Sequence, residues 1–199
     1  MQVAGGHYHV TARGTAKAAI FTTGEDRLRF LLVLGEVVEQ FGWRLYAYCL
    51  MENHYHLALM TPEANLGAGM SRLNQLYAQW FNHRHDRVGH LFQERYWSQL
   101  IENESYVLAV VRYIAANPVR AGLCDRPRDW PWSSARATAG LDPVPKFLDV
   151  AWVLRTFAAD TGEAAALYEA MVEGGDSPRL SAYLVPKRRS PASPRPGRM

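Results

Sequence analysis

The stretch WRLYAYCLMENHYHLALM, residues 43–60, decides the fold of this chain. Residues 43–51 and 54–60 are rich in aromatic and aliphatic side chains, a composition typical of β-strands. Glu52 and Asn53 stand between them and tolerate turn conformations. We therefore predict that the two segments pair as a β-hairpin.

Further elements flank this hairpin on both sides. The predicted elements outside it are a strand at 7–13, a helix at 25–41, a helix at 65–82, a strand at 90–100 and a helix at 103–117. Thr22-x-x-Glu25 has the form of a capping box, and Asn65 and Asn103 are suitable first residues for the other two helices. Pro118 predicts that the last helix ends near residue 117, because proline lacks an N–H group and disfavours the helical conformation of the residue before it.

The order of these elements is strand, helix, strand, strand, helix, strand, helix. It predicts an α+β fold: a ferredoxin-like β-α-β-β-α-β core with an antiparallel sheet and one additional helix. We expect this domain to span residues 1–132. A C-terminal helical extension is expected over 133–180, packed on the domain. Residues 181–199 contain four prolines and a basic cluster and are expected to form a disordered tail.

Composition limits the function classes. Of 199 residues, 48% are hydrophobic and 12% aromatic, which is too apolar for a chain that is disordered throughout. Continuous apolar stretches such as 30–34 are far shorter than a membrane span needs, and the first residues do not have the pattern of a secretory signal. Cys49 and Cys124 are the only cysteines. A disulfide framework is therefore not expected, and we expect a cytoplasmic location.

Positive charge is concentrated in two parts of the chain. The net charge is +3, yet the tail from residue 187 onward carries five basic residues and no acidic one. Residues 72–96 and 112–136 are also rich in arginine, whereas 141–186 is acidic. This pattern favours a polyanionic partner, because Lys and Arg release counterions when they neutralise phosphates. Ordinary solvated surface arginines are the alternative.

His54-Tyr55-His56 is the sharpest local signal for chemistry. In a strand, residues i and i+2 project from the same face, so both imidazoles can converge on one metal ion. Neutral imidazole is a good ligand for a divalent ion. Two solvent-facing histidines are the alternative, and His7-Tyr8-His9 has the same spacing and is not excluded by it.

Tyr113 and Asn117 lie four residues apart on one face of the predicted helix. Tyrosine is a weak nucleophile, but a metal that polarises a scissile phosphate lowers the demand on it. The amide oxygen of Asn117 could complete the metal site. The alternative is that Tyr113 packs in the core and that Asn117 only ends the helix.

The sequence resembles the REP-associated tyrosine transposases, which belong to the HUH superfamily of single-strand DNA transposases and contain an IS200-like transposase domain. The resemblance covers roughly residues 7–175 and rests on five blocks in order. These are HVTARG (9–14), CLMENHYHLAL (49–59), NQLYAQWFNHRHDRVGHLFQERYWS (74–98), RYIAANPVRAGL (112–123) and WPWSSARA (130–137).

The resemblance implies metal-dependent cleavage and rejoining of single-stranded DNA next to hairpins formed by REP-like palindromes. Tyr113 would form a covalent 5′-phosphotyrosine intermediate, and His54, His56 and Asn117 would hold Mg²⁺ or Mn²⁺. Relatives often have Gln at the position of Asn117. They typically have Pro where this chain has Glu52, a change that adds a negative charge near the metal but removes no ligand.

The resemblance also implies a partner, a location and a set of contacts. The partner would be a single-stranded DNA hairpin rather than a membrane, and the location the bacterial cytoplasm, in association with the nucleoid. The wider group includes dimers with shared active sites, so both a monomer and a homodimer are open. The residues expected to contact DNA phosphates are Arg13, Arg84, Arg87, Arg95 and Arg120.

Parts of the sequence are compatible with two other functions. His9-Val10-Thr11 has the form used by two-histidine phosphoesterases, but such enzymes need this element twice and no second copy is found. The chain could also be a non-catalytic ferredoxin-like module that binds nucleic-acid hairpins with its sheet. That reading leaves the paired histidines and Tyr113 without a role.

Overall fold

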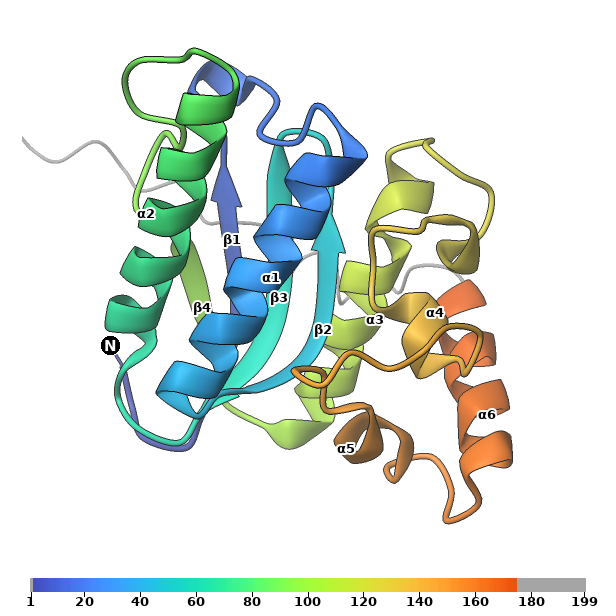
Figure 1. Cartoon of the computed structure of the whole chain (residues 1–199). Coiled ribbons are helices and arrows are strands. Elements are labelled where there is room, and N and C mark those ends of the chain that lie inside the picture. The colour runs from blue at the N-terminus through green and yellow to red at the C-terminus, as the bar shows by residue number, and fades with distance from the viewer. Residues whose placement is uncertain (1, 175–199) are drawn as a thin grey trace, which may run out of the picture.

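A computed structural model of the chain describes residues 2–174, apart from the side chains of 104 and 105, and shows a four-stranded sheet with helices on both faces (Figure 1). The elements are β1 (Gly6–Arg13), α1 (Gly24–Phe41), β2 (Arg44–Leu50), β3 (His54–Thr61), α2 (Leu66–Arg84), β4 (Trp97–Ile101), α3 (Glu104–Arg120), α4 (Ala135–Thr138), α5 (Val150–Leu154) and α6 (Thr161–Glu173). Short 3-10 turns lie at Thr15–Lys17 and Pro127–Asp129.

The sheet has the strand order β2-β3-β1-β4, and all neighbouring strands are antiparallel. The two strands of the central hairpin are therefore neighbours, and β1 lies between β3 and β4. This is the order of a ferredoxin-like sheet, so the predicted α+β fold is confirmed. The predicted hairpin is confirmed as well, with a bulge in β2 at Tyr46.

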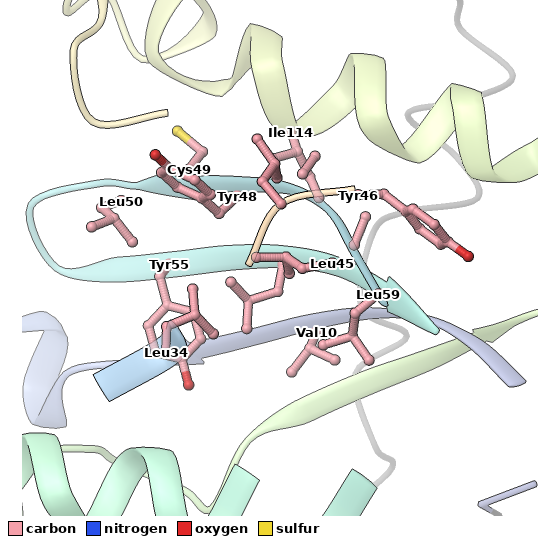
Figure 2. Close-up of a cluster of buried hydrophobic side chains, with 14 of the residues drawn as sticks. Val10, Leu34, Leu45, Tyr46, Tyr48, Cys49, Leu50, Tyr55, Leu59 and Ile114 are labelled. Carbon is pink, nitrogen blue, oxygen red and sulfur yellow. The ribbon is translucent and has the colours of Figure 1, made fainter. Parts of the chain in front are cut away.

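Alternate residues of β3 face different layers of helices. The Tyr55 ring contacts Phe30 of α1, and its hydroxyl donates a hydrogen bond to Asn74 of α2. The His56 ring lies on the other face, against Tyr113 of α3. Figure 2 shows the apolar part of both faces, with Tyr55 and Leu59 on one side of the sheet and Ile114 of α3 on the other. The ferredoxin-like face that α1 and α2 leave uncovered is thus occupied by α3.

The start of α1 differs from the prediction by one residue. Thr23, not Thr22, is the N-cap, and its hydroxyl accepts a hydrogen bond from the amide of Asp26. The Asp26 carboxylate accepts in return from the Thr23 amide and also from the amide and hydroxyl of Thr22. Asp26 is therefore the acidic partner in the capping box, in place of Glu25.

Helix α2 begins after Asn65, as predicted, but Asn65 does not cap it through its side chain. The side-chain oxygen of Asn65 accepts a hydrogen bond from the Trp43 indole, and its amide donates to the carbonyl of Phe41. The residue instead ties the end of α1 to the start of β2.

Two other predicted boundaries were wrong. The strand predicted at 90–100 begins only at Trp97, because residues 90–96 cross the end of β1 and make only an isolated bridge there, between Gly14 and Phe92. Helix α3 continues through Pro118 to Arg120. A proline removes a single N–H donor, and hydrogen bonds from Ala121 and Leu123 complete the last turn.

The chain after α3 packs along the free edge of β2. The amide of Leu50 donates to the carbonyl of Trp132, and the amide of Ser134 donates to the carbonyl of Tyr48. Farther on, Asp149 forms an ion pair with Arg44. Residues 133–174 contain the helices α4, α5 and α6, so this part of the expected extension is helical. No helix of residues 2–174 is long and apolar enough to cross a bilayer. The predicted tail at 181–199 lies outside the described residues.

Candidate active site

His54 and His56 lie at the beginning of β3, on the face that α3 covers. Their ring centroids are 5.0 Å apart and the rings are nearly perpendicular. His56 is buried and His54 half-buried. The two-residue period of the strand therefore brings both imidazoles to the same place, as the motif predicts.

Tyr113 comes to the same histidines from the middle of α3. Its ring centroid is 5.8 Å from that of His56, and the rings meet edge to face. Its ring also lies 5.7 Å from that of His9 on β1. The phenol is half-buried rather than part of the sealed core. Residues separated by almost sixty positions in the sequence thus form one cluster.

A second histidine pair was not predicted. His9 Nε2 and His56 Nδ1 are 3.0 Å apart, in a buried hydrogen bond that runs diagonally between β1 and β3. The Trp97 ring of β4 packs edge-on against His9. Because His56 uses Nδ1 in this bond, its Nε2 is the nitrogen left to bind a ligand.

His54 has its own partner in the hairpin turn. Its Nδ1 is 2.7 Å from Oδ1 of Asn53, whose amide nitrogen in turn donates to the carbonyl of Lys17 at 3.0 Å. The Nε2 atom of His54 is therefore the one not used in this bond. Both histidines of the motif are held through Nδ1.

The three histidines of the cluster are neutral at physiological pH. Burial lowers the pKa of His9 from its ordinary value of 6.5 to about 3. Burial, with a smaller contribution from the charge of Arg13, lowers the pKa of His54 to about 4. Burial also places the pKa of His56 well below 6.5, and the nearby His9, His54, Arg13 and Arg120 act in the same direction. Neutral imidazole is the form that binds a metal ion.

The donor set suits a divalent cation. The side-chain amide of Asn117 donates to the carbonyl of Tyr113 at 2.8 Å, so its Oδ1 atom is not the atom used in that bond. Two imidazole nitrogens and one amide oxygen are borderline and hard donors that Mn²⁺ and Mg²⁺ accept. Among residues 2–174, no three His, Cys, Asp or Glu side chains are arranged around a common metal position. The predicted third ligand, the Asn117 amide, is of another chemical type.

Arg120 and Arg13 border the cluster on two sides. The Arg120 guanidinium lies over the Tyr113 ring, 4.8 Å from its centroid. Arg13 is the register partner of His54 across β1 and β3, and its side chain is exposed. Both charges reach His56 electrostatically. The site thus has positive charge beside a neutral histidine pair.

The other three predicted arginines, Arg84, Arg87 and Arg95, lie against other parts of the molecule. Arg95 is exposed in the segment that leads into β4, next to the end of β1. Arg84 forms an ion pair with Glu25 and lies over the Trp80 ring. Arg87 lies over Phe81. Arg84 and Arg87 therefore belong to the side of the sheet that α1 and α2 cover.

The His9-x-Thr11 element and Glu52 have contacts of their own. Thr11, the last residue of the His9-x-Thr11 element, donates its hydroxyl to the Tyr55 carbonyl, and His9 is buried against His56. Both side chains are therefore engaged with β3. The Glu52 carboxylate is exposed and its charge acts on Arg27 of α1. The Glu52 carbonyl accepts hydrogen bonds from the amides of Ile20 and Phe21, which fixes the turn.

A ferredoxin-like sheet with a His-x-His pair facing a tyrosine on a covering helix is the architecture of the tyrosine transposase class. Comparison with known proteins agrees with this. The sequence model of the family described as "Transposase IS200 like" matches residues 2–117, more than half of the chain. The chain belongs to this family.

Two individual relatives extend the comparison. A Haemophilus influenzae protein named as a REP-associated tyrosine transposase is 27% identical over 110 residues, which are 50% of this chain and 62% of that protein. The solved structure of a REP-associated tyrosine transposase bound to a REP hairpin superimposes with a TM-score of 0.60 at 22% identity. That match covers 75% of this chain and 91% of the other and shows that the fold is shared.

Proposed function

We propose that this protein is a metal-dependent single-strand DNA endonuclease and transposase, which cleaves and rejoins DNA next to hairpins formed by REP-like palindromes. The observation that carries the proposal is the contact between Tyr113 and the His-x-His pair on the α3 face of the sheet. Membership of the IS200-like family and the likeness to relatives named for REP palindromes support the reaction and the DNA substrate.

Tyr113 is the nucleophile of the proposed reaction. Its phenol oxygen attacks a backbone phosphorus, and a new bond forms between that oxygen and the 5′ phosphate. The bond from phosphorus to the 3′ oxygen breaks, and the 3′ oxygen takes up a proton while the phenol loses one. The reverse attack, by a 3′ hydroxyl on the phosphotyrosine, rejoins the strand without any other energy source.

His54, His56 and Asn117 are the residues proposed to hold Mg²⁺ or Mn²⁺. A divalent ion at such a site polarises the scissile phosphate and offsets the charge that develops on it. The two imidazoles present Nε2 because each uses Nδ1 in a hydrogen bond within the protein. Their low pKa values keep them unprotonated at physiological pH.

The arginines have separate roles in the proposal. Arg120 stacks on Tyr113, which orients the phenol and places positive charge beside the atom that becomes negative. Arg13 and Arg95 lie near the end of β1 and are proposed to contact DNA phosphates there. Arg84 and Arg87 would serve the hairpin on the other side, where Arg84 must exchange its exposed partner Glu25 for a phosphate. Exposed ion pairs are weak, so that exchange costs little.

The division of the chain into a catalytic domain at 1–132, an extension at 133–180 and a tail at 181–199 also stays a proposal. The hydrogen bonds between β2 and residues 132–134 support an extension that is anchored on the domain edge. A location in the bacterial cytoplasm, with the nucleoid DNA, follows from the proposed substrate.

The proposal is tested by trapping the covalent intermediate. The protein is incubated with Mn²⁺ and a labelled single-stranded hairpin with its flanks, and adducts are resolved on a denaturing gel. We expect an adduct that is lost in Tyr113→Phe and strongly reduced in His56→Ala. Tyr106→Phe, on the exposed side of the same helix, is the matched control and should retain it.

Other outcomes point to other functions. Cleavage that persists in Tyr113→Phe would indicate a water-dependent phosphodiesterase. Tight hairpin binding without cleavage, for several REP-like hairpins, would favour the non-catalytic binding module.

A further inference from the structure

Asn53 occupies the turn between β2 and β3, directly before the two histidines. Its side chain makes two hydrogen bonds, one at each end of the amide group. Nδ2 is 3.0 Å from the carbonyl oxygen of Lys17, and Oδ1 is 2.7 Å from Nδ1 of His54. From the sequence, Asn53 is only a turn residue, so this bridge is a separate structural finding.

The two bonds together fix the tautomer of His54. The Lys17 carbonyl can only accept a hydrogen bond, so the Asn53 group that faces it must be the NH₂ donor. The amide oxygen of Asn53 therefore faces His54, and because an amide oxygen only accepts, Nδ1 of His54 must carry the proton. A neutral imidazole has one N–H group, which leaves Nε2 with a free lone pair.

We propose that Asn53 is a positioning residue that holds His54 in its metal-binding tautomer. The inference deepens the proposed function, because it rests on His54 being a ligand of the divalent ion. A hydrogen-bond acceptor on the far nitrogen of a ligating histidine sets which nitrogen binds and how the ring is oriented. In this protein a side-chain amide has that role for His54.

The position of Asn53 is itself held from outside the hairpin. The Gly14 amide donates to the Asn53 carbonyl, and the amides of Ile20 and Phe21 donate to the carbonyl of the preceding residue. Ala16 and Lys17 both have positive φ, of 54° and 62°, which turns the Lys17 carbonyl towards Asn53. Left-handed backbone at two residues with a Cβ is unfavourable, so surrounding contacts must maintain it.

Without this acceptor, His54 would exchange between two tautomers, and the form with its proton on Nε2 cannot bind a cation through Nε2. Asn53→Leu keeps the approximate size of the side chain and removes both bonds. Asn53→Asp keeps an acceptor towards His54, removes the donor towards Lys17 and adds a negative charge. Asn82→Leu is a matched control, since the Asn82 amide also donates to a loop carbonyl, that of Gly89, without contacting the histidines.

The first measurement uses the metal-free protein without DNA. Long-range ¹H–¹⁵N NMR correlations of the histidine rings distinguish a protonated ring nitrogen from a bare one. We expect His54 to carry its proton on Nδ1 in the wild type, in Asn53→Asp and in Asn82→Leu, and to lose this preference in Asn53→Leu. A wild-type spectrum with the proton on Nε2 overturns the inference, as does an Asn53→Asp spectrum with that pattern.

The second measurement is the binding of Mn²⁺ alone, by isothermal titration calorimetry. We expect Asn53→Leu to raise the Kd by about 10-fold or more, the usual effect of removing a partner of a metal ligand. Asn82→Leu should remain near the wild-type value, and Asn53→Asp should bind Mn²⁺ at least as tightly as the wild type, because its carboxylate keeps the acceptor and adds a negative charge. An unchanged Kd in folded Asn53→Leu overturns the inference. Should Asn53→Leu not fold, the wild-type and Asn53→Asp spectra decide.

These readouts separate the inference from the proposed function. If Tyr113 forms no DNA adduct while His54 has the expected tautomer and Mn²⁺ affinity depends on Asn53, the reaction proposal fails and the inference holds. If the adduct forms and neither the tautomer nor the Mn²⁺ affinity depends on Asn53, the reaction proposal holds and the inference about Asn53 fails.

Discussion

His9 and His56 share one buried hydrogen bond, and its direction decides which nitrogen of His56 can bind a cation. Binding through Nε2 requires the His56 proton on Nδ1, with His9 Nε2 as the acceptor. His9 lies on β1, 47 residues away in the sequence, and is 1% exposed. A neutral histidine that is completely buried beside a ligand is suited to holding that ligand in place.

Substitution of His9 tests this. His9→Phe retains a ring against Trp97 and Tyr113 but removes the acceptor, and we expect the Kd for Mn²⁺ to rise by about 10-fold or more. His9→Gln supplies another acceptor and should recover part of the affinity. His7→Phe is the control, because His7 faces the same side of the sheet but stacks on Tyr46. Equal affinities for wild type and folded His9→Phe, by calorimetry, would contradict the role.

The sequence predicts those residues of the site that lie close together on one strand or one helix. His54 and His56 share a face because strands have a period of two, and Tyr113 and Asn117 share a face because helices have a period of 3.6. The second partners were not predictable in this way. His9 meets His56 only through the register of β1 against β3, and Asn53 meets His54 only because the turn is held by residues 14–21. Pairing register and loop packing are tertiary features that a single sequence does not determine.

At the scale of elements, the end of β1 and the turn after it support the hairpin turn that carries Asn53. Gly14, the residue after β1, lies close to Ala18 and Ile20, which follow the turn. A Cβ at this position would be 2.2 Å from the carbonyl oxygen of Ala18 and 2.9 Å from the Ile20 side chain. A backbone oxygen cannot move away without shifting the turn at Thr15–Lys17.

Gly14→Ala should therefore displace this turn and the Lys17 carbonyl with it. We expect the free energy of unfolding to fall by about 1–3 kcal/mol, a typical cost of overpacking, as measured by urea denaturation. Gly24→Ala is the control, since a Cβ there lies 3.4 Å from Trp132, an ordinary contact, and the residue begins α1. A Gly14→Ala protein as stable as the wild type would show that the turn is more adaptable than its contacts indicate.

The start of α1 is joined to the end of α2 through one buried carboxylate. Asp26 is 0% exposed, and His85 donates to it at 2.9 Å. Burial alone would raise the pKa of Asp26, but hydrogen bonds from His85, Thr22 and Thr23 lower it from 3.8 to about 2. The ionised carboxylate therefore stabilises the folded state.

The pH dependence of stability follows from this pKa. Above about pH 5 the Asp26 carboxylate is ionised in both states and its contribution is complete. Between pH 4 and pH 2 the unfolded chain binds a proton that the folded protein does not, so about 2 kcal/mol is lost across this range. We expect Asp26→Asn to be less stable at pH 7 by a similar amount and to lose stability less steeply below pH 4.

Glu25→Gln is the control for this prediction. Glu25 is adjacent in the sequence and pairs with Arg84, but its side chain is 59% exposed. Exposed pairs contribute little, so the variant should follow the wild-type profile within about 1 kcal/mol. Urea denaturation at a series of pH values provides both curves, and parallel curves for Asp26→Asn and wild type below pH 4 would rule out the assignment.

Both wrong element boundaries arise from the tertiary surroundings of the segment, which local sequence does not include. Residues 90–96 have strand-like side chains, yet residues 7–11 of β1 are already paired with Trp97–Ile101 and β1 ends at Arg13, so residues 90–96 run mostly past the end of their partner strand. Local propensity does not include the availability of a partner. Pro118 was expected to end the helix, whereas the loss of one hydrogen bond is tolerated in a helix packed against all four strands of the sheet. The order of the elements was predictable because it depends on periodicity and turn residues alone.

At the scale of the whole molecule, the candidate site is assembled from β1, β3 and α3 of a single chain. The fold brings Tyr113 against His56 and His9 of the same chain, with α3 packed across the sheet (Figure 1). Proteins of the wider class that share active sites between two copies would need α3 to cross to a partner. Here the helix is also fixed to its own chain by α6 and the turn at Pro127–Asp129.

The arrangement predicts cleavage in cis. A mixture of Tyr113→Phe and His56→Ala proteins should form no more DNA adduct than the two variants form separately, because no copy has both an intact tyrosine and an intact histidine pair. If copies exchanged α3, some sites would combine the intact Tyr113 of one variant with the intact histidines of the other, and adduct would reappear.

The adduct is quantified on a denaturing gel after the variants are mixed, with preincubation long enough for subunits to exchange. As a control, the wild-type rate should rise in direct proportion to protein concentration, as expected when one chain is sufficient. Recovery of adduct in the mixture would contradict a cis site while leaving the roles of His56 and Tyr113 intact.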